Sequence, residues 1–237
     1  MPKTVVIVGS LDTKGAEFAF IRDLIEKEGL QTLVVDFGVM GPPAFEADIK
    51  RKEVTEAAGG DLHYLSSGEH KDLAMRTMAD GLAKIVGKLY QQGRLDGIIG
   101  MGGTGGTSIA TAAMRALPVG LPKVMVSTVG GGDVSAYAGT RDITFMPSIV
   151  DVAGINSISR KIYTNAAGAI TGMVRLEAPK PSEEKPLVTA SMFGNTTDCV
   201  DRARAIVENN DYEVLVFHAT GSGGKTMESL IEDGFIS

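Results

Sequence analysis

The chain shows its architecture most clearly in the stretch Gly97-Ile-Ile-Gly-Met-Gly-Gly-Thr-Gly-Gly-Thr-Ser-Ile109. It begins as a short apolar run, passes through a glycine-dense loop, and continues into a helical pattern that Pro118 ends. A buried strand, a glycine loop and a helix in this order are typical of an α/β unit whose parallel sheet is covered on both faces.

The same order of elements recurs along the chain. Apolar runs predict strands at residues 4–8, 32–36, 97–99, 123–127, 143–150, 187–191 and 214–217. Helical stripes predict helices around residues 18–25, 73–89, 109–117, 155–173 and 197–207. Strand–helix–strand alternation implies right-handed crossovers, so we expect a doubly wound, mainly parallel, Rossmann-like sheet.

A charged, proline-bearing stretch, Lys180-Pro-Ser-Glu-Glu-Lys-Pro186, interrupts this alternation. We interpret it as a surface linker, which gives a nucleotide-binding α/β unit over residues 1–180 and the start of a second α/β unit over 181–237. The alternative is an ordinary long loop inside one domain. The chain stops at Ser237, where the next strand is expected, so the second unit is expected to be truncated.

Composition excludes several classes of partner. The 237 residues carry a formal net charge of -6, no cluster of Lys or Arg, 5% aromatic residues and no Trp, which disfavours nucleic acid and anionic membranes. No apolar run reaches membrane-spanning length and residues 1–8 do not form a signal peptide, so a cytoplasmic location is expected. Cys199 has no partner for a disulfide and is interpreted as a small buried hydrophobe. The three histidines lack ligand spacing, so we predict no metal-ligating residues.

Four glycine-bearing loops follow predicted strands. They are Gly9-Ser-Leu-Asp-Thr-Lys-Gly15, Gly100-Met-Gly-Gly-Thr-Gly-Gly-Thr107, Thr128-Val-Gly-Gly-Gly-Asp133 and Thr220-Gly-Ser-Gly-Gly-Lys-Thr226. Ligands of open α/β sheets bind at the carboxyl ends of the strands, and glycine there permits positive φ and close approach of the backbone. Free N–H groups at the following helix then form an anion site. The alternative is that these loops are plain strand–helix turns.

The residues expected to hold phosphate come from these loops. The main candidates are Gly102, Gly103, Thr104, Gly105, Gly106 and Thr107, and further candidates are Gly9, Asp12, Lys14, Gly131 and Gly132. Asp12 could instead cap a helix, and Lys14 could be solvated. Asp133 and Asp151 could hold Mg²⁺ beside a triphosphate or could cap helices. No catalytic residue is assigned.

Two familiar motifs match only in part. Residues 100–105 fit the dinucleotide pattern G-x-G-x-x-G, but the next strand ends Val126-Ser127-Thr128 without the acidic residue that would hold a ribose, which disfavours NAD. Asp36, at the end of the second predicted strand, could hold the ribose only if the first loop bound the nucleotide, and Gly9-Ser-Leu lacks the G-x-G-x-x-G spacing.

The segment Ala219-Thr-Gly-Ser-Gly-Gly-Lys-Thr226 approximates a P-loop. Only eleven residues follow Thr226, fewer than the later strands of a P-loop NTPase need. Lys225 therefore remains either a phosphate contact or a solvated lysine. His218 could serve as an acid or base or contact a ligand, or could be an ordinary loop histidine.

In combination, three motifs resemble one family. They are Val5-Ile-Val-Gly-Ser-Leu-Asp-Thr-Lys14, the loop of residues 100–107, and Phe217-His-Ala-Thr-Gly-Ser-Gly-Gly-Lys225. The chain is similar over nearly its whole length to the ATP-binding domain family of the tomato mosaic virus resistance protein and its bacterial and fungal relatives. The resemblance implies two α/β subdomains, ATP binding and self-association into a homo-oligomer. It points to residues 102–107 as the nucleotide loop, and it implies that the same cleft is lined by Gly221, Gly223, Gly224 and Lys225.

Three functions remain open at this point. The first is binding of a nucleotide, with ATP expected and Mg²⁺ as its possible companion. The second is an enzyme that acts on a small phosphorylated or carboxylated metabolite. The third is an interaction module whose glycine loops only shape a surface. Whether the chain is an enzyme is left undecided.

Overall fold

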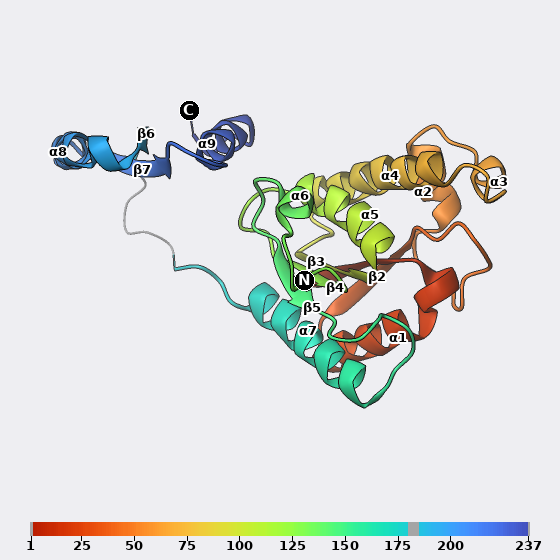
Figure 1. The fold of residues 1–237 in the computed structure, drawn as a ribbon. Coiled ribbons are helices and arrows are strands. Elements are labelled where there is room, and N and C mark those ends of the chain that lie inside the picture. Colours follow the sequence, from red (N-terminus) through yellow and green to blue (C-terminus); the bar gives the residue numbers. More distant parts are fainter. Residues whose placement is uncertain (1, 180–184, 237) are drawn as a thin grey trace. The chain divides into compact units, whose positions relative to one another are not determined.

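The chain forms two units. The computed structural model describes residues 2–179 and 185–236, and contacts divide the chain into Met1–Glu177 and Ala178–Ser237 (Figure 1). Residues 180–184 of the expected linker lie outside the described residues.

The first unit is built on a five-stranded sheet in the order β2-β1-β3-β4-β5. Its strands are β1 (Thr4–Gly9), β2 (Gln31–Asp36), β3 (Gly97–Gly102), β4 (Lys123–Ser127) and β5 (Thr144–Pro147). All neighbouring pairs are parallel, and Val8 of β1 lies opposite Val35 on one side and Gly100 on the other. The predicted mainly parallel α/β fold is confirmed.

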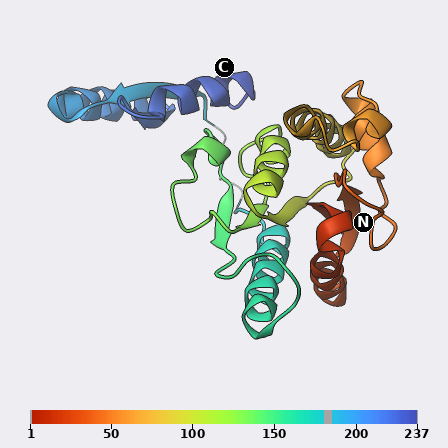
Figure 2. The ribbon, with the colours of Figure 1, turned by 45° about the vertical axis from the view of Figure 1, so that its right-hand side comes forward.

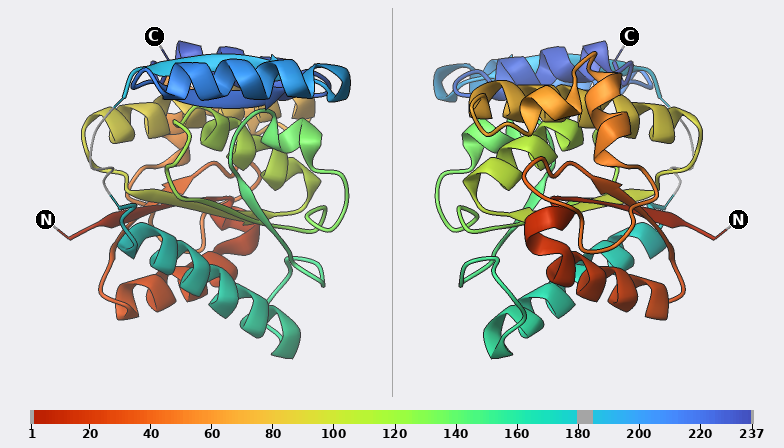
Figure 3. Two further views of the ribbon diagram at one scale, coloured as in Figure 1. Left: turned by 90° about the vertical axis from the view of Figure 1, so that its left-hand side faces the viewer. Right: turned by 90° about the vertical axis from the view of Figure 1, so that its right-hand side faces the viewer.

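Helices cover both faces of this sheet (Figures 2 and 3). One face carries α1 (Leu11–Lys27) and α7 (Ser157–Arg175), and the other carries α2 (Arg51–Ala57), α4 (Lys71–Gln91) and α5 (Thr104–Arg115). Two short helices, α3 (Leu62–Leu65) and α6 (Ser135–Ala138), complete the unit. Among the described residues, no helix is both long enough and apolar enough to cross a membrane.

Alternating side chains of β1 supply a core to each face. Val5 and Ile7 pack with α1 and α7, whereas Val6 and Val8 pack with α4 and α5. All four are fully buried, as expected for a β-branched run in a sheet that is covered on both faces.

The direction of the strand order changes between β1 and β3. The chain leaves β1 through α1 on one face and leaves β3 through α5 on the other. The two connections diverge and leave a crevice at the carboxyl ends of these strands, which is where open α/β sheets bind ligands.

The second unit contains a two-stranded parallel sheet. Its elements are β6 (Leu187–Met192), the 3-10 turn η1 (Gly194–Thr196), α8 (Thr197–Glu208), β7 (Glu213–His218) and α9 (Gly223–Glu232). One expectation for this unit is wrong: Cys199 is exposed, because α8 buries none of its residues. Thr196 precedes α8 but makes no side-chain cap, since its hydroxyl bonds the backbone of Phe193.

Candidate functional site

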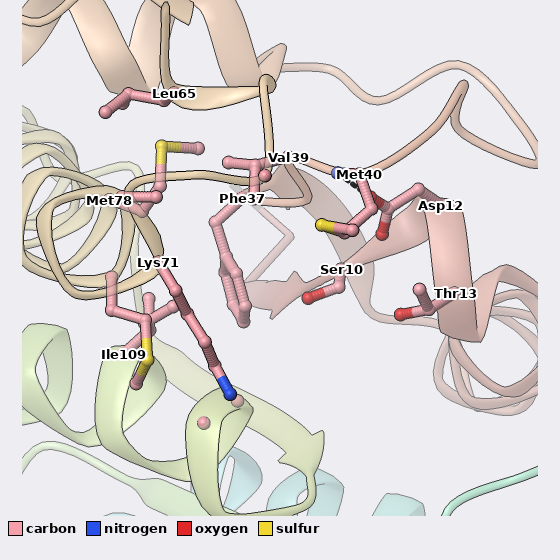
Figure 4. Close-up of a pocket in the computed structure, with 15 residues that line it drawn as sticks. Ser10, Asp12, Thr13, Phe37, Val39, Met40, Leu65, Lys71, Met78 and Ile109 are labelled. Carbon is pink, nitrogen blue, oxygen red and sulfur yellow. Dashed lines mark hydrogen bonds between the residues drawn. The ribbon is translucent and has the colours of Figure 1, made fainter.

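A pocket of about 460 Å³ lies at the crevice between β1 and β3, on the face of α4 and α5 (Figure 4). The β1–α1 turn, the segment after β2, the region around α3, and the helices α4 and α5 all contribute to it. Its lining residues are Ser10, Asp12, Thr13, Phe37, Val39, Met40, Leu65, Gly68, Lys71, Ala74, Met75, Met78, Gly105, Gly106 and Ile109.

The first turn of α5 forms one wall. Gly103 precedes the helix without a side-chain cap, and its carbonyl accepts the N–H of Thr107 at 2.9 Å. Among the described residues, the backbone N–H groups of Gly105 and Gly106 have no acceptor. Unpaired N–H groups at a helix start carry the positive end of the helix dipole, so this wall favours an anion.

The glycines of this loop differ in whether packing within the chain explains the absence of a side chain. A Cβ on Gly102 would lie 3.1 Å from the Cα of Gly106, so the chain itself needs a small residue there. A Cβ on Gly103 or Gly105 would meet nothing closer than 3.8 and 3.7 Å, respectively. Packing within the chain therefore does not explain these two glycines, and a ligand that approaches the backbone would.

The expectation of positive φ in this loop is wrong. None of the glycines at positions 100–106 has a positive φ. β3 extends to Gly102 instead of ending near residue 99, and Gly103 is extended, with φ -76° and ψ -165°. The strand enters the helix directly, so no left-handed residue is needed.

Lys71, the first residue of α4, was missed by sequence reasoning. It lines the pocket, and Figure 4 shows its ammonium group pointing toward α5. No other cationic side chain lines the pocket among the residues that the structure describes. A lysine 31 positions before Gly102 gives no local signal, because only the packing of α4 on α5 brings it there.

Two carboxylates organise the turn between β1 and α1. Asp36, at the end of β2, accepts the N–H groups of Leu11 at 3.0 Å and Gly38 at 2.8 Å. Burial raises the pKa of Asp36, against the lowering effect of these hydrogen bonds. Asp12 does not cap a helix. Its Oδ2 accepts the N–H groups of Met40 at 2.7 Å and Gly41 at 3.2 Å, and so anchors the segment that follows β2.

Gly9 and Lys14 do not line the pocket. A Cβ on Gly9 would lie 2.1 Å from the ring of Phe18, so packing explains this glycine. The ammonium group of Lys14 donates to the carbonyl of Val152 on the loop after β5. In the first loop, Ser10, Asp12 and Thr13 therefore line the pocket, whereas Gly9 and Lys14 make contacts within the fold.

Thr107 and the third loop also lie outside this pocket's lining. The hydroxyl of Thr107 pairs with that of Ser127 at 2.6 Å, and both residues are fully buried. A Cβ on Gly131 would lie 3.8 Å from Pro147, and one on Gly132 would lie 3.7 Å from the carbonyl oxygen of Val129.

The second unit holds the remaining candidates. Gly221 has φ +74°, and a Cβ on Gly223 would lie 1.9 Å from the carbonyl oxygen of His218, so backbone geometry requires both glycines. Gly224 and Lys225 belong to the first turn of α9. The Nδ1 atom of His218 lies 2.8 Å from the hydroxyl of Thr220.

No group of three or more metal-ligating side chains occurs within residues 2–179 and 185–236. Asp133 accepts the N–H of Ser135, which lowers the pKa of its carboxyl group.

Comparison with known proteins places the sequence in a family context. Residues 3–179 match the model of the "Uncharacterised protein family (UPF0261) N-terminal domain", and residues 185–237 match that of the C-terminal domain. A UPF0261 protein of Clostridium tetani is 52% identical over 236 residues, which cover 100% of this chain and 58% of that protein. The chain thus spans just under three fifths of the length of this relative.

The ToMV susceptible protein tm-1(GCR26) of Solanum lycopersicum is 36% identical over 252 residues, covering 98% of this chain and 33% of that protein. This homology confirms the family to which the sequence motifs pointed. Among solved structures, a putative UDP-N-acetylglucosamine 2-epimerase from Listeria monocytogenes has a TM-score of 0.40 at 12% identity, covering 98% of this chain and 66% of that one.

Proposed function

We propose that this chain, which belongs to the UPF0261 family, binds a nucleotide in the pocket between β1 and β3, and that the nucleotide is ATP. The observation that carries the proposal is the first turn of α5, whose unpaired N–H groups at Gly105 and Gly106 line a pocket at the strand-order change. Lys71 adds a cation at the same wall, which suits phosphate.

The remaining surface suits the rest of a nucleotide. Phe37, Val39, Leu65, Met78 and Ile109 give most of the pocket an apolar lining, and its volume lies within the usual range for small-molecule sites. The β1–α1 turn is unsuited to phosphate, because Asp36 already occupies the N–H of Leu11 and Asp12 adds a second carboxylate.

Among the described residues, one carboxylate lines this pocket, that of Asp12, but its Oδ2 accepts the N–H groups of Met40 and Gly41 and its Oδ1 is buried. The lining therefore offers magnesium no open carboxylate oxygen, and a magnesium ion that came with the phosphates would be held by them and by water. A bound Mg²⁺ would offset part of the phosphate charge.

The alternative is a small phosphorylated or carboxylated metabolite, on which the chain would act as an enzyme. The α5 turn and Lys71 favour it equally, since both recognise an anion and neither recognises a base.

A thermal-shift panel of nucleotides, sugar phosphates and dicarboxylates tests the proposal. A ligand at one hundred times its Kd adds about 2.7 kcal/mol of stability. We expect the largest shift with ATP. A shift confined to metabolites would favour the alternative, and no shift with any compound would favour an interaction module.

Gly105→Ala and Gly168→Ala form a matched pair for this panel. Both glycines lie in helices and neither Cβ would clash with the chain. Alanine in a helix is favoured over glycine by up to about 1 kcal/mol, so neither variant should lose stability. We expect only Gly105→Ala to lose the shift with ATP, and an unchanged shift in that variant would count against the α5 site.

A further inference from the structure

One wall of the pocket is a segment that is only loosely attached to the rest of the unit. It comprises α3 and the turn that leads into α4, residues 61–70, and we call it the flap. Within the described part of the chain, every hydrogen bond of residues 61–69 stays inside the flap, such as the bond from the N–H of His63 to the carboxylate of Asp61 at 2.9 Å. The rings of Tyr64 and His70 stack at 4.4 Å and close the flap on itself. The flap is therefore a self-contained piece of structure.

A single buried side chain attaches the flap to its surroundings. Leu65 is 4% exposed, and no other residue of the flap is buried. Leu65 lines the pocket and belongs to neither core cluster, and Figure 4 shows it at the opposite end of the pocket from Asp12 and Thr13. Burial of one leucine favours the packed position by about tenfold to hundredfold. The flap can therefore leave the pocket without disturbing either core.

The flap borders both parts of the proposed nucleotide site. Leu65 and Gly68 line the pocket, and Lys71 follows the flap directly as the first residue of α4. A nucleotide whose phosphates lie at Lys71 and α5 extends its apolar part along a lining that includes Leu65. The bound nucleotide then gives Leu65 a further partner, so binding favours the packed position of the flap.

We propose that the flap is a gate, which opens to admit the nucleotide and closes on it through Leu65; this regulation of the site rests on the proposed function. Closure of a surface segment over a ligand excludes water and slows release. Gly59, which precedes the flap, has φ +76°, and a Cβ there would meet nothing within 4 Å. The chain can therefore turn at this glycine when the flap moves.

A fluorescent reporter on the flap tests for the movement. The full chain contains no Trp, so Tyr64→Trp introduces a single indole, which can stack on His70 as the tyrosine ring does. ATP should reduce the quenching of this indole by acrylamide. Tyr90→Trp is the matched control, because Tyr90 is comparably exposed and lies on α4 outside the pocket lining, and its quenching should not change.

The rates of ATP binding separate a gate from a fixed wall. In the Tyr64→Trp chain, Leu65→Ala removes the side chain that holds the gate shut, so stopped-flow mixing should show association about threefold or more faster and dissociation about tenfold or more faster. A fixed wall would change dissociation alone. Leu73→Ala is the matched control, because Leu73 is exposed on the first turns of α4 and lies outside the lining, and neither rate should change.

Calorimetry with ATP on the same chains keeps the two proposals distinguishable. Unchanged quenching at position 64 in a chain that binds ATP would overturn the gate and leave the proposed function standing. An equal change in Tyr90→Trp would also overturn the gate, since the response would then be global. So would a Leu65→Ala chain in which only dissociation is faster. Failure of the wild-type chain to bind ATP would remove the proposed function itself.

Discussion

At Lys71, a single substitution tests the proposed phosphate site separately from the nucleoside. Lys71→Ala should weaken ATP about tenfold or more but adenosine little, because only the phosphates lose a charged partner. The loss should shrink at high salt, since Lys71 is exposed. Lys88→Ala, on the same helix but outside the pocket lining, is the control. Equal losses for ATP and adenosine in a calorimetric titration would mean that Lys71 supports the fold instead.

Tyr163 is fully buried, and burial together with the charge of Glu17 raises the pKa of its hydroxyl to about 12, from 10.0 for a free tyrosine. Since the unfolded chain ionises first, the stabilising contribution is complete below pH 10 and is lost as the pH rises toward 12. We expect the free energy of unfolding to fall over this range, and to fall less in Tyr163→Phe.

Chemical denaturation at several pH values between 9 and 11 measures this slope. Tyr64→Phe is the control, because Tyr64 is half exposed. Identical slopes in the wild-type chain and Tyr163→Phe would show that the buried hydroxyl does not govern alkaline stability.

Single residues show where sequence reasoning stops. Asp12 is visible in the first loop, where the sequence leaves it either a phosphate-site residue or a helix cap. The structure gives it another partner, because its carboxylate accepts backbone N–H groups of the segment after β2, whereas Asp36 accepts the N–H at the start of α1. Lys71 reaches the pocket only through long-range packing. Local patterns name the chemistry of a side chain, and only tertiary contacts decide its partner.

At the scale of elements, β1 and α1 pack closely where Gly9 of the strand faces the ring of Phe18 on the helix. Because a Cβ there would lie 2.1 Å from the Phe18 ring, Gly9→Ala should destabilise the fold by about 1–3 kcal/mol, the usual cost of overpacking. Urea denaturation measures this loss. Gly103→Ala is the matched control, since its nearest neighbour would be 3.8 Å away.

Shortening the opposing side chain separates packing from backbone effects. Gly9→Ala combined with Phe18→Leu should cost less than the sum of the two single changes, because leucine removes the ring that the new methyl group meets. Strictly additive losses would contradict the packing explanation for this glycine.

The elements themselves were largely predictable. Buried parallel strands are continuous apolar runs, and five of the seven predicted strands match the observed ones to within one residue at each end. β3 runs past its predicted end to Gly102, because Gly100 and Gly102 read as loop residues although both are paired with β4. β5 ends at Pro147, three residues before the predicted end at residue 150. The short helices α2, α3, α6 and η1 were not predicted, because a helix of two turns or fewer is too short to show an apolar stripe in the sequence.

At the scale of the whole molecule, the two units differ in how much core they possess. The first contains two extensive buried clusters, whereas the described part of the second buries only two hydrophobic side chains, Val214 and Ile236. The parallel fold class follows from the alternation of elements and is confirmed. Self-association and a cytoplasmic location stay predictions, and the 58% share of the Clostridium tetani relative makes any activity of the longer proteins a separate question.

This difference in burial predicts how the chain exchanges its amide hydrogens. Peptides from β1, β3 and β4 should exchange slowly and those from β6 and β7 rapidly, because opening free energy follows burial. ATP should slow exchange in three segments of the first unit, 10–13, 37–41 and 102–109, which line or adjoin the pocket. Mass spectrometry with and without ATP resolves these segments, and adenosine is the control that lacks phosphate. Slower exchange with ATP at residues 220–226 would show that the glycine loop of the second unit also responds to the nucleotide. Unchanged exchange at residues 102–109 would exclude α5 as the phosphate site, because a bound phosphate must engage the N–H groups whose exchange is measured.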